Sequence, residues 1–207
     1  MEDPQNRRPI QARSSRWAQR TAAWLSRRDV SPNQISVASI AFAAAGSALL
    51  VFVPGPVGLV GCALGIQGRL ICNLLDGMVA VEGGKKSALG QIYNEFPDRI
   101  ADSLLLIAAG YAIDLPAVGW FAALAAALTA YIRVFGGSLG LPQDFRGPMA
   151  KQHRMAVMTI GCVIGAAEHA VSGTAYVVLA ATVAIAAGSL LTCVTRTLAI
   201  AARLQRS

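Results

Sequence analysis

Six apolar stretches, each close to the length that crosses a lipid bilayer, follow one another along this chain of 207 residues. A helix needs about 20 predominantly apolar residues to span the hydrocarbon core of a membrane. Turn-forming residues such as Pro54-Gly55-Pro56 and Ser172-Gly173 separate the stretches. Because backbone polar groups in lipid must pair within their own segment, the pattern predicts an all-α membrane protein with six transmembrane helices. The predicted spans are residues 35–53, 57–81, 88–113, 115–136, 155–171 and 174–199.

Composition agrees with a membrane protein rather than a soluble one. Hydrophobic residues make up 55% of the chain and charged residues only 14%, whereas about a quarter of a soluble domain is charged. The net charge of +7 is compatible with nucleic acid or with an anionic membrane as a partner. The long apolar stretches favour membrane lipids, and we expect no nucleic-acid partner. The four cysteines lie inside apolar stretches without metal-ligand spacing, so we expect neither disulfides nor zinc.

Basic residues predict the orientation of the chain in the membrane. With six spans, both termini and the loops at 82–87 and 137–154 lie on one side. Apart from Arg69, every Lys and Arg lies in or next to those segments, and the opposite loops carry only Asp114, Glu168 and His169. Because cytoplasmic loops carry the excess of Lys and Arg, we expect both termini in the cytoplasm. The expected location is the bacterial inner membrane, as a multi-pass protein.

The N-terminal segment has its own pattern. Within residues 13–28, Trp17 and Trp24 fall at helical spacing opposite a row of arginines. This arrangement predicts an interfacial amphipathic helix on anionic lipid, with a solvated basic tail as the alternative. The first thirty or so residues lack the apolar core of a signal peptide, so we expect no cleavable signal. We therefore divide the chain into a basic N-terminal segment, 1–30, and a six-helix transmembrane domain, 31–207.

Polar side chains interrupt the second and third predicted spans. Charged groups inside a bilayer are costly and mark functional sites. Residues 73, 76 and 80 share one helix face by their spacing, and residues 90, 94, 98 and 102 share another. The polar side chains are Asn73, Asp76, Asn94, Asp98 and Asp102.

These side chains are expected to face one another in levels. The two spans are antiparallel and joined by a short loop, so residues equally far from that loop lie at equal depth. The expected pairs are Asp76 with Asn94, Asn73 with Asp98, and Arg69 with Asp102. The two upper levels offer only oxygen ligands, which suit a hard cation such as Mg²⁺, Mn²⁺ or Ca²⁺. We expect the deepest level to be an ion pair that forms a structural floor; polar contacts that merely hold two helices together are the alternative for the whole cluster.

The spacing of these residues resembles the signature of the CDP-alcohol phosphotransferase (CDP-alcohol phosphatidyltransferase) family. That signature runs Asp-x2-Asp-Gly-x2-Ala-Arg-x8-Gly-x3-Asp-x3-Asp. Every spacing is intact in this chain, and Ser31-Pro32-Asn33 and the run from Gly147 to Arg154 resemble two further family motifs. The matching residues are Asn73, Asp76, Gly77, Ala80, Val81, Gly90, Asn94 and Asp98.

The resemblance implies an enzyme of phospholipid biosynthesis, usually a homodimer, whose active site opens to the cytoplasm. Such enzymes transfer the phosphatidyl group of a CDP-linked lipid, here most simply CDP-diacylglycerol, to an alcohol acceptor and release CMP. Carried over to this sequence, the metal ligands for Mg²⁺ or Mn²⁺ are Asn73, Asp76, Asn94 and Asp98, and Asp98 is also the catalytic base. The residues expected around the donor and acceptor are Gly77, Ala80, Lys85, Gly90, Arg133, Lys151 and Arg154.

The chain departs from the family signature at three positions. Asparagine replaces aspartate at positions 73 and 94, and Val81 replaces the arginine. Four negative charges thereby fall to two, and we predict weaker metal binding, with one ion in the substrate-free site. The asparagines also motivate an alternative, a catalytically silent relative that binds lipid or nucleotide. A cation channel or carrier is a third reading, which the dry outer halves of the spans disfavour.

Overall fold

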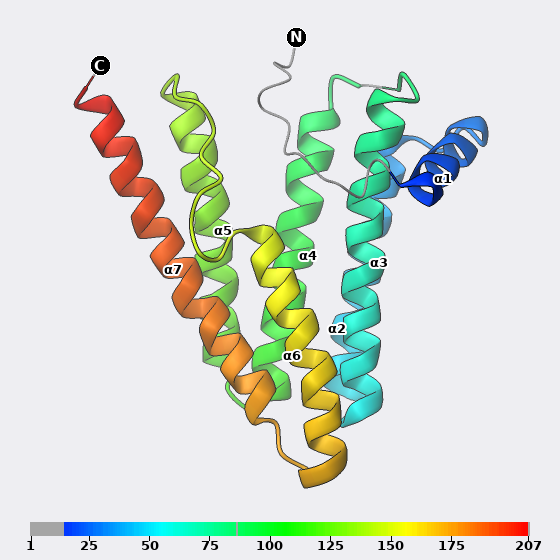
Figure 1. The fold of residues 1–207 in the computed structure, drawn as a ribbon, viewed down its shortest axis with the longest axis vertical. Coiled ribbons are helices and arrows are strands. Elements are labelled where there is room, and N and C mark those ends of the chain that lie inside the picture. Colours follow the sequence, from blue (N-terminus) through cyan, green and yellow to red (C-terminus); the bar gives the residue numbers. More distant parts are fainter. Residues whose placement is uncertain (1–14, 86, 207) are drawn as a thin grey trace.

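The computed structural model describes residues 15–85 and 87–206, and this part of the chain is helical with no strand. A short first helix precedes six long ones (Figure 1). The helices are α1 (Arg16–Arg27), α2 (Pro32–Phe52), α3 (Pro56–Val81), α4 (Gly90–Ala112), α5 (Pro116–Ser138), α6 (Lys151–Ser172) and α7 (Tyr176–Leu204).

The long helices coincide with the six apolar stretches. Five of them, α2, α3, α5, α6 and α7, are long and apolar enough to cross a membrane, which makes this an integral membrane fold. The remaining long helix, α4, has the length but carries the charged residues of the predicted site. Helix α6 begins at Lys151, four residues before the predicted start. Its first turn is polar, so hydropathy places the start of the span later than the start of the helix.

A capping box marks the start of α2. Ser31 caps the helix: its hydroxyl accepts a hydrogen bond from the backbone N–H of Gln34 at 3.2 Å, and the Gln34 side chain accepts one from the Ser31 N–H at 2.9 Å. Pro32 occupies the first turn, where its missing N–H is not needed. This reciprocal cap fixes where the chain enters the bundle from α1.

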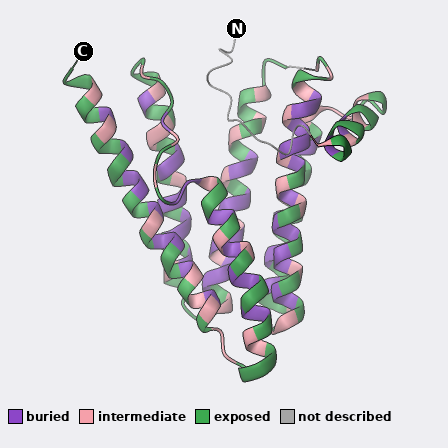
Figure 2. Ribbon diagram, viewed as in Figure 1, coloured by how far each residue is buried: buried purple, intermediate pink, exposed green. Residues whose placement is uncertain are grey.

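The six long helices form a closed ring. Following their contacts, α3 packs on α2, α2 on α4, α4 on α5, α5 on α7, α7 on α6, and α6 returns to α3. Buried residues follow the inward faces of these helices, and exposed residues follow the outward faces (Figure 2). Figure 1 shows that α6 begins partway down the bundle, so that the segment 139–150 descends from the end of α5 to reach it.

Glycines allow the closest helix crossings. A Cβ atom on Gly65 of α3 would lie 2.8 Å from the Cα of Gly46 in α2, and one on Gly119 of α5 would lie 2.8 Å from the Cα of Gly110 in α4. Small residues in this way let membrane helices approach backbone to backbone. The small-residue faces at Gly61/Gly65 and Gly161/Gly165 pack within the chain, against Leu49, Gly46, Ala181 and Val178.

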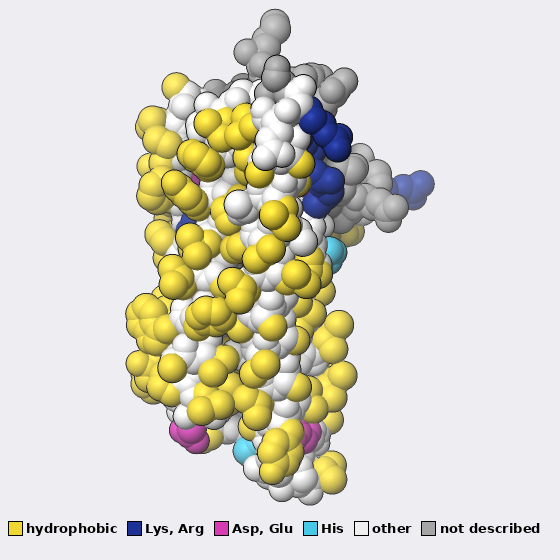
Figure 3. Space-filling view, turned by 90° about the vertical axis from the view of Figure 1, so that its left-hand side faces the viewer, with side chains coloured by type: hydrophobic (Ala, Val, Ile, Leu, Met, Phe, Trp, Pro, Cys, Tyr) yellow, Lys and Arg dark blue, Asp and Glu magenta, His cyan; other side chains and the backbone are white. Residues whose placement is uncertain are grey.

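Helix α1 packs beside the end of α3 that carries the polar cluster. Its Ala18 and Ala22 are buried in one apolar cluster with residues of α3, while Trp17 and Trp24 remain about half exposed. Figure 3 shows a broad apolar surface on one side of the molecule, with Lys and Arg gathered near the upper end and acidic side chains near the lower end. This separation of charge along the long axis matches the asymmetry of basic residues in the sequence.

Candidate active site

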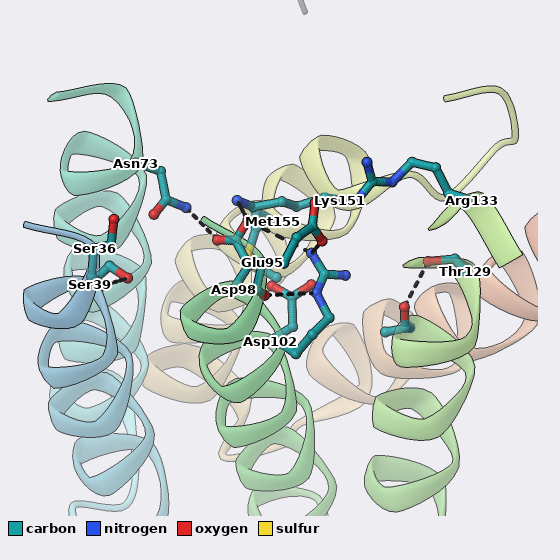
Figure 4. Close-up of polar contacts among 12 residues, drawn as sticks. Ser36, Ser39, Asn73, Glu95, Asp98, Asp102, Thr129, Arg133, Lys151 and Met155 are labelled. Carbon is teal, nitrogen blue, oxygen red and sulfur yellow. Dashed lines mark hydrogen bonds and ion pairs between the residues drawn. The ribbon is translucent and has the colours of Figure 1, made fainter. Parts of the chain in front are cut away.

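The polar cluster lies where α3 and α4 face each other, at the level where α6 begins (Figure 4). Asp98 of α4 is at its centre. The amide nitrogen of Asn73 donates a hydrogen bond to Asp98 Oδ1 at 2.9 Å, and the Lys151 ammonium donates to Oδ2. The predicted pairing of Asn73 with Asp98 is therefore confirmed, and Lys151 is brought to the same carboxylate from a helix far along the chain.

Cations surround the Asp98 carboxylate. Besides Lys151, the Arg69 guanidinium lies 3.3 Å from Oδ1 and the Arg99 guanidinium 3.7 Å from Oδ2. The Asp98 side chain is only 11% exposed. At this burial an ionised carboxylate needs compensating charge, and three basic side chains supply it.

A second layer of ion pairs lies beneath Asp98. Arg69, fully buried, places its guanidinium 2.6 Å from Asp102 Oδ1, which confirms the predicted Arg69–Asp102 floor. The sequence did not indicate that Arg154 belongs to the same floor. Its guanidinium lies 2.9 Å from Asp102 Oδ2 and also donates to the Thr129 hydroxyl and to the Met149 carbonyl. Asp102 is thus shared by two buried arginines from α3 and α6.

Asp76 has different surroundings from Asp98. It is 7% exposed and accepts a hydrogen bond of 2.6 Å from the Ser36 hydroxyl of α2. Among the described residues, no Lys or Arg lies within 4.0 Å of its carboxylate. Asn94, predicted at the same depth, is exposed, and no hydrogen bond joins it to Asp76 in the part of the chain described.

The remaining predicted residues are distributed around this centre. Gly77, Ala80 and Gly90 are partly buried, and a Cβ atom on Gly90 would have open space apart from the Ser87 hydroxyl 3.7 Å away. The Lys85 ammonium is turned toward α1, where it donates at 2.9 Å to the Ser26 carbonyl and to Asp29. Lys85 can contact a substrate only if its hydrogen bonds to Ser26 and Asp29 break. Arg154, predicted near the acceptor, is only 1% exposed. Asp102 and the Met149 carbonyl hold its guanidinium in the layer of ion pairs beneath Asp98.

Arg133 lies at the rim of the centre, at the end of α5. Its guanidinium is 2.5 Å from the Glu95 carboxylate, donates to the Gln143 side chain, and lies 5.3 Å from the centre of the Phe145 ring. A pocket in the surface adjoins the start of α2 and α4. This pocket is lined by Ser31, Asn33, Gln34, Val37 and Tyr93.

The segment 139–150 is clamped by α7, which the sequence did not predict. The Thr192 hydroxyl accepts a hydrogen bond from the Met149 N–H at 3.0 Å, and Arg196 donates to the Arg146 carbonyl at 2.8 Å and to the Thr129 carbonyl at 2.6 Å. Within the segment, the hydrogen-bonded Arg146 guanidinium holds the pKa of the buried Asp144 carboxyl below its usual range. The clamp fixes the start of α6 and thereby the position of Lys151.

The oxygen-rich centre contains few carboxylates. Among the described residues, no group of three or more His, Cys, Asp and Glu side chains is arranged to hold a metal ion. This follows from the two asparagines, since only Asp76 and Asp98 remain acidic at the four signature positions. A metal ion here would depend on amide oxygens and on the phosphates of a substrate.

Comparison with known proteins identifies relatives, although no protein-family model matches the chain. It is 31% identical over 147 residues to an archaetidylinositol phosphate synthase from Aeropyrum pernix, covering 70% of this chain and 74% of the relative. It is 28% identical over 189 residues to a phosphatidylinositol phosphate synthase from Streptomyces avermitilis, covering 86% of this chain and 75% of the relative.

Solved structures share the fold. The phosphatidylinositol phosphate synthase of Mycobacterium tuberculosis with CDP-DAG bound matches with a TM-score of 0.77 at 20% identity, over 90% of this chain and 94% of that one. The same enzyme in complex with manganese and citrate matches with a TM-score of 0.75 at 19% identity, over 88% of each chain. The intact spacing of the signature, the ring of helices around it and the identity to the Aeropyrum enzyme lead to one conclusion. This chain belongs to the CDP-alcohol phosphatidyltransferase family, membrane enzymes that transfer a phosphatidyl group from a CDP-linked lipid to an alcohol.

Proposed function

We propose that this chain transfers the phosphatidyl group of CDP-diacylglycerol to a phosphorylated polyol of the inositol phosphate class and releases CMP. The donor is supported by the CDP-DAG bound to the Mycobacterium enzyme, and the acceptor class by the names of the two relatives. The observation that carries the proposal is the Asp98 carboxylate, held by Asn73 and Lys151 where α3, α4 and α6 meet.

The residues of the centre fit a divalent cation such as Mg²⁺ or Mn²⁺. Asp76 is a buried carboxylate with one hydroxyl donor and no cationic partner among the described residues, which is a costly arrangement that a bound cation relieves. Asn73 gives its amide N–H to Asp98, so its carbonyl oxygen remains available as a ligand. We propose Asp76, Asn73 and Asn94 as its ligands, with Asp98 joining them only where the ion displaces the Lys151 ammonium. A divalent ion bound there neutralises charge on the pyrophosphate of the donor.

The reaction itself needs a base at the acceptor. The acceptor hydroxyl oxygen forms a bond to the phosphorus of the phosphatidyl group, and the bond from that phosphorus to the CMP oxygen breaks, so that CMP leaves with the bonding electrons. Asp98 receives the proton of the hydroxyl. Asn73 and Arg69 fix Asp98 through Oδ1, which keeps the carboxylate oriented during the transfer. We propose that Arg133 and Lys151 bind the phosphate of the acceptor, because Arg133 presents a cationic group at the rim and Lys151 presents one in the centre beside Asp98.

The topology in the membrane belongs to the same proposal. We propose that α4 is the sixth span, since its 23 residues are long enough and its charges pair with α3 and α6 inside the ring. The termini and the centre then face the cytoplasm of the cell membrane, with α1 at the lipid interface as a basic N-terminal segment. We propose a homodimer as the functional assembly from the family resemblance.

The test is CMP release by the purified protein in mixed micelles that contain CDP-diacylglycerol and Mn²⁺ or Mg²⁺. Inositol phosphate and glycerol phosphate are compared as acceptors, and the lipid product is identified by mass spectrometry. Asp98→Asn should lower the rate at least about a hundredfold, as loss of a general base does. Asp114→Asn, at the opposite end of the bundle, serves as the matched control and should retain activity. Binding of CDP-diacylglycerol without CMP release by the wild-type protein would instead identify a silent relative.

A further inference from the structure

The two carboxylates that remain at the signature positions are not equivalent. Asp98 has three cationic neighbours, Lys151, Arg69 at 3.3 Å and Arg99 at 3.7 Å. Asp76 has the Ser36 hydroxyl at 2.6 Å, and no Lys or Arg of the described residues comes within ion-pair distance of it. Asp98 is therefore compensated by ion pairs, whereas Asp76 is held by hydrogen bonds from the Ser36 hydroxyl and the Gly77 backbone N–H, with no ion pair among the described residues.

This difference sets where a divalent ion is favoured. An ion at Asp76 meets a buried carboxylate without an ion-pair partner among the described residues, and the amide oxygen of Asn73 is available as a further ligand. A second ion at Asp98 would have to displace Lys151 or lie beside it, and like charges within a few ångströms in a partly buried site repel strongly. The exposed Asn94 adds an oxygen but no charge to offset that repulsion.

We infer that this chain has a centre with one divalent cation and one lysine, in which the Lys151 ammonium compensates Asp98 in place of a second metal ion. The inference rests on the proposed function, because it concerns the same centre. The clamp on the segment 139–150 supports it, since Met149 and Arg146 are tied to α7 and hold the start of α6, where Lys151 is the first residue. Lys151 is therefore a built part of the centre rather than a freely moving surface lysine; its side chain is 22% exposed.

The experiment measures Mn²⁺ binding to the purified full-length protein in detergent, without nucleotide or lipid substrate. Free Mn²⁺ is followed by its electron paramagnetic resonance signal. The wild-type protein should bind one Mn²⁺ per chain. Lys151→Gln should tighten Mn²⁺ binding by about tenfold or more, because it removes a positive charge that repels a second cation from the partly buried site. Asp76→Asn should abolish binding.

Two further variants separate charge from folding. Lys151→Arg keeps the charge beside Asp98 and should bind Mn²⁺ like the wild type. Arg206→Gln removes the same charge at the exposed end of the chain and should leave the affinity unchanged. The triple variant with Asn73→Asp, Asn94→Asp and Lys151→Gln should bind two ions.

Two results overturn the inference: two tightly bound Mn²⁺ ions in the wild-type protein, or a Lys151→Gln variant whose Mn²⁺ affinity equals that of the wild type. Neither measurement depends on turnover. If Mn²⁺ binds as expected but no CMP is released with any acceptor, the proposed function is wrong and the inference of a centre with one cation and one lysine is supported. If CMP is released but two ions bind to the wild type, the function stands and the inference fails.

Discussion

Asp102 illustrates how a single side chain holds the floor of this bundle together. It is 2% exposed and contacts guanidinium groups from both α3 and α6. A buried ion pair contributes little compared with a well-packed apolar pair, but removal of one partner leaves buried charge without compensation. Removal of Asp102 should therefore lower the stability of the protein by more than the net stabilisation that its ion pairs contribute.

We predict that Asp102→Asn lowers the free energy of unfolding by about 3–5 kcal/mol, because two buried arginines then lack their shared counter-charge. The thermal unfolding temperature in detergent should fall by several degrees, as measured by intrinsic fluorescence or light scattering. Asp114→Asn is the control, since it changes the same chemical group in a loop away from the floor. An unfolding temperature of Asp102→Asn equal to that of the control would contradict a structural role for the floor.

At the scale of helices, close crossings depend on glycine pairs. Gly110 and Gly119 bring α4 against α5 with no side chain between them. This crossing positions the face of α4 that carries Asp98 and Asp102 relative to the rest of the ring. A side chain inserted here pushes against backbone atoms, which cannot give way as the end of a flexible side chain can.

We predict that Gly119→Ala destabilises the protein by about 1–3 kcal/mol, the usual range for overpacking a tight contact. Gly137→Ala is the matched control on the same helix, because its nearest neighbour would be a flexible Gln143 side-chain atom 3.9 Å away. Thermal unfolding of both variants in the same detergent provides the comparison. Equal stability of the two variants would show that the α4–α5 crossing adjusts without strain.

The levels of the polar cluster show how far the sequence could predict this site. Counting residues from the loop between α3 and α4 predicted the pairs Asn73–Asp98 and Arg69–Asp102, because helical rise gives the relative depth of residues on two adjacent antiparallel helices. The same counting could not predict the contact of Arg154 with Asp102, which joins residues 52 positions apart. Nor could it predict the contact of Lys151 with Asp98, since both depend on how far α6 descends into the bundle.

The boundaries of the helices have a similar explanation. Hydropathy and turn residues place the spans well because lipid thickness dictates their length. They say nothing of the segment 139–150, whose course depends on Thr192 and Arg196 of α7. Helix α4 fails a hydropathy criterion for the same reason that it matters chemically: its polar side chains face partners inside the ring.

At the scale of the whole molecule, α1 differs from the ring in its exposed aromatic residues. Trp17 is 48% and Trp24 50% exposed, although Ala18 and Ala22 between them are buried against α3. Arg28 lies over the Trp24 ring at 5.5 Å. Such a helix, with indoles and arginines together on its free surface, suits the boundary between lipid headgroups and acyl chains.

We predict that Trp17 lies at this boundary in a bilayer. In a Trp24→Phe/Trp120→Phe variant reconstituted into anionic vesicles, lipids brominated near the headgroup should quench Trp17 fluorescence more than lipids brominated deep in the acyl chain. Omission of the anionic lipid should weaken the quenching, since the arginines of α1 lose their attraction to the surface. Quenching by iodide in water with no effect of either brominated lipid would place α1 in solvent.

The shared floor also has a consequence for how the protein is assembled in the membrane. Arg69, Asp102 and Arg154 lie on three different helices, and each alone is a charge that the hydrocarbon interior excludes. The hairpin of α3 and α4 can shield Arg69 and Asp102 as soon as both have been inserted. In the proposed topology Arg154, near the start of α6, gains its counter-charge only when that hairpin is in place, so we expect α6 to pack after α3 and α4.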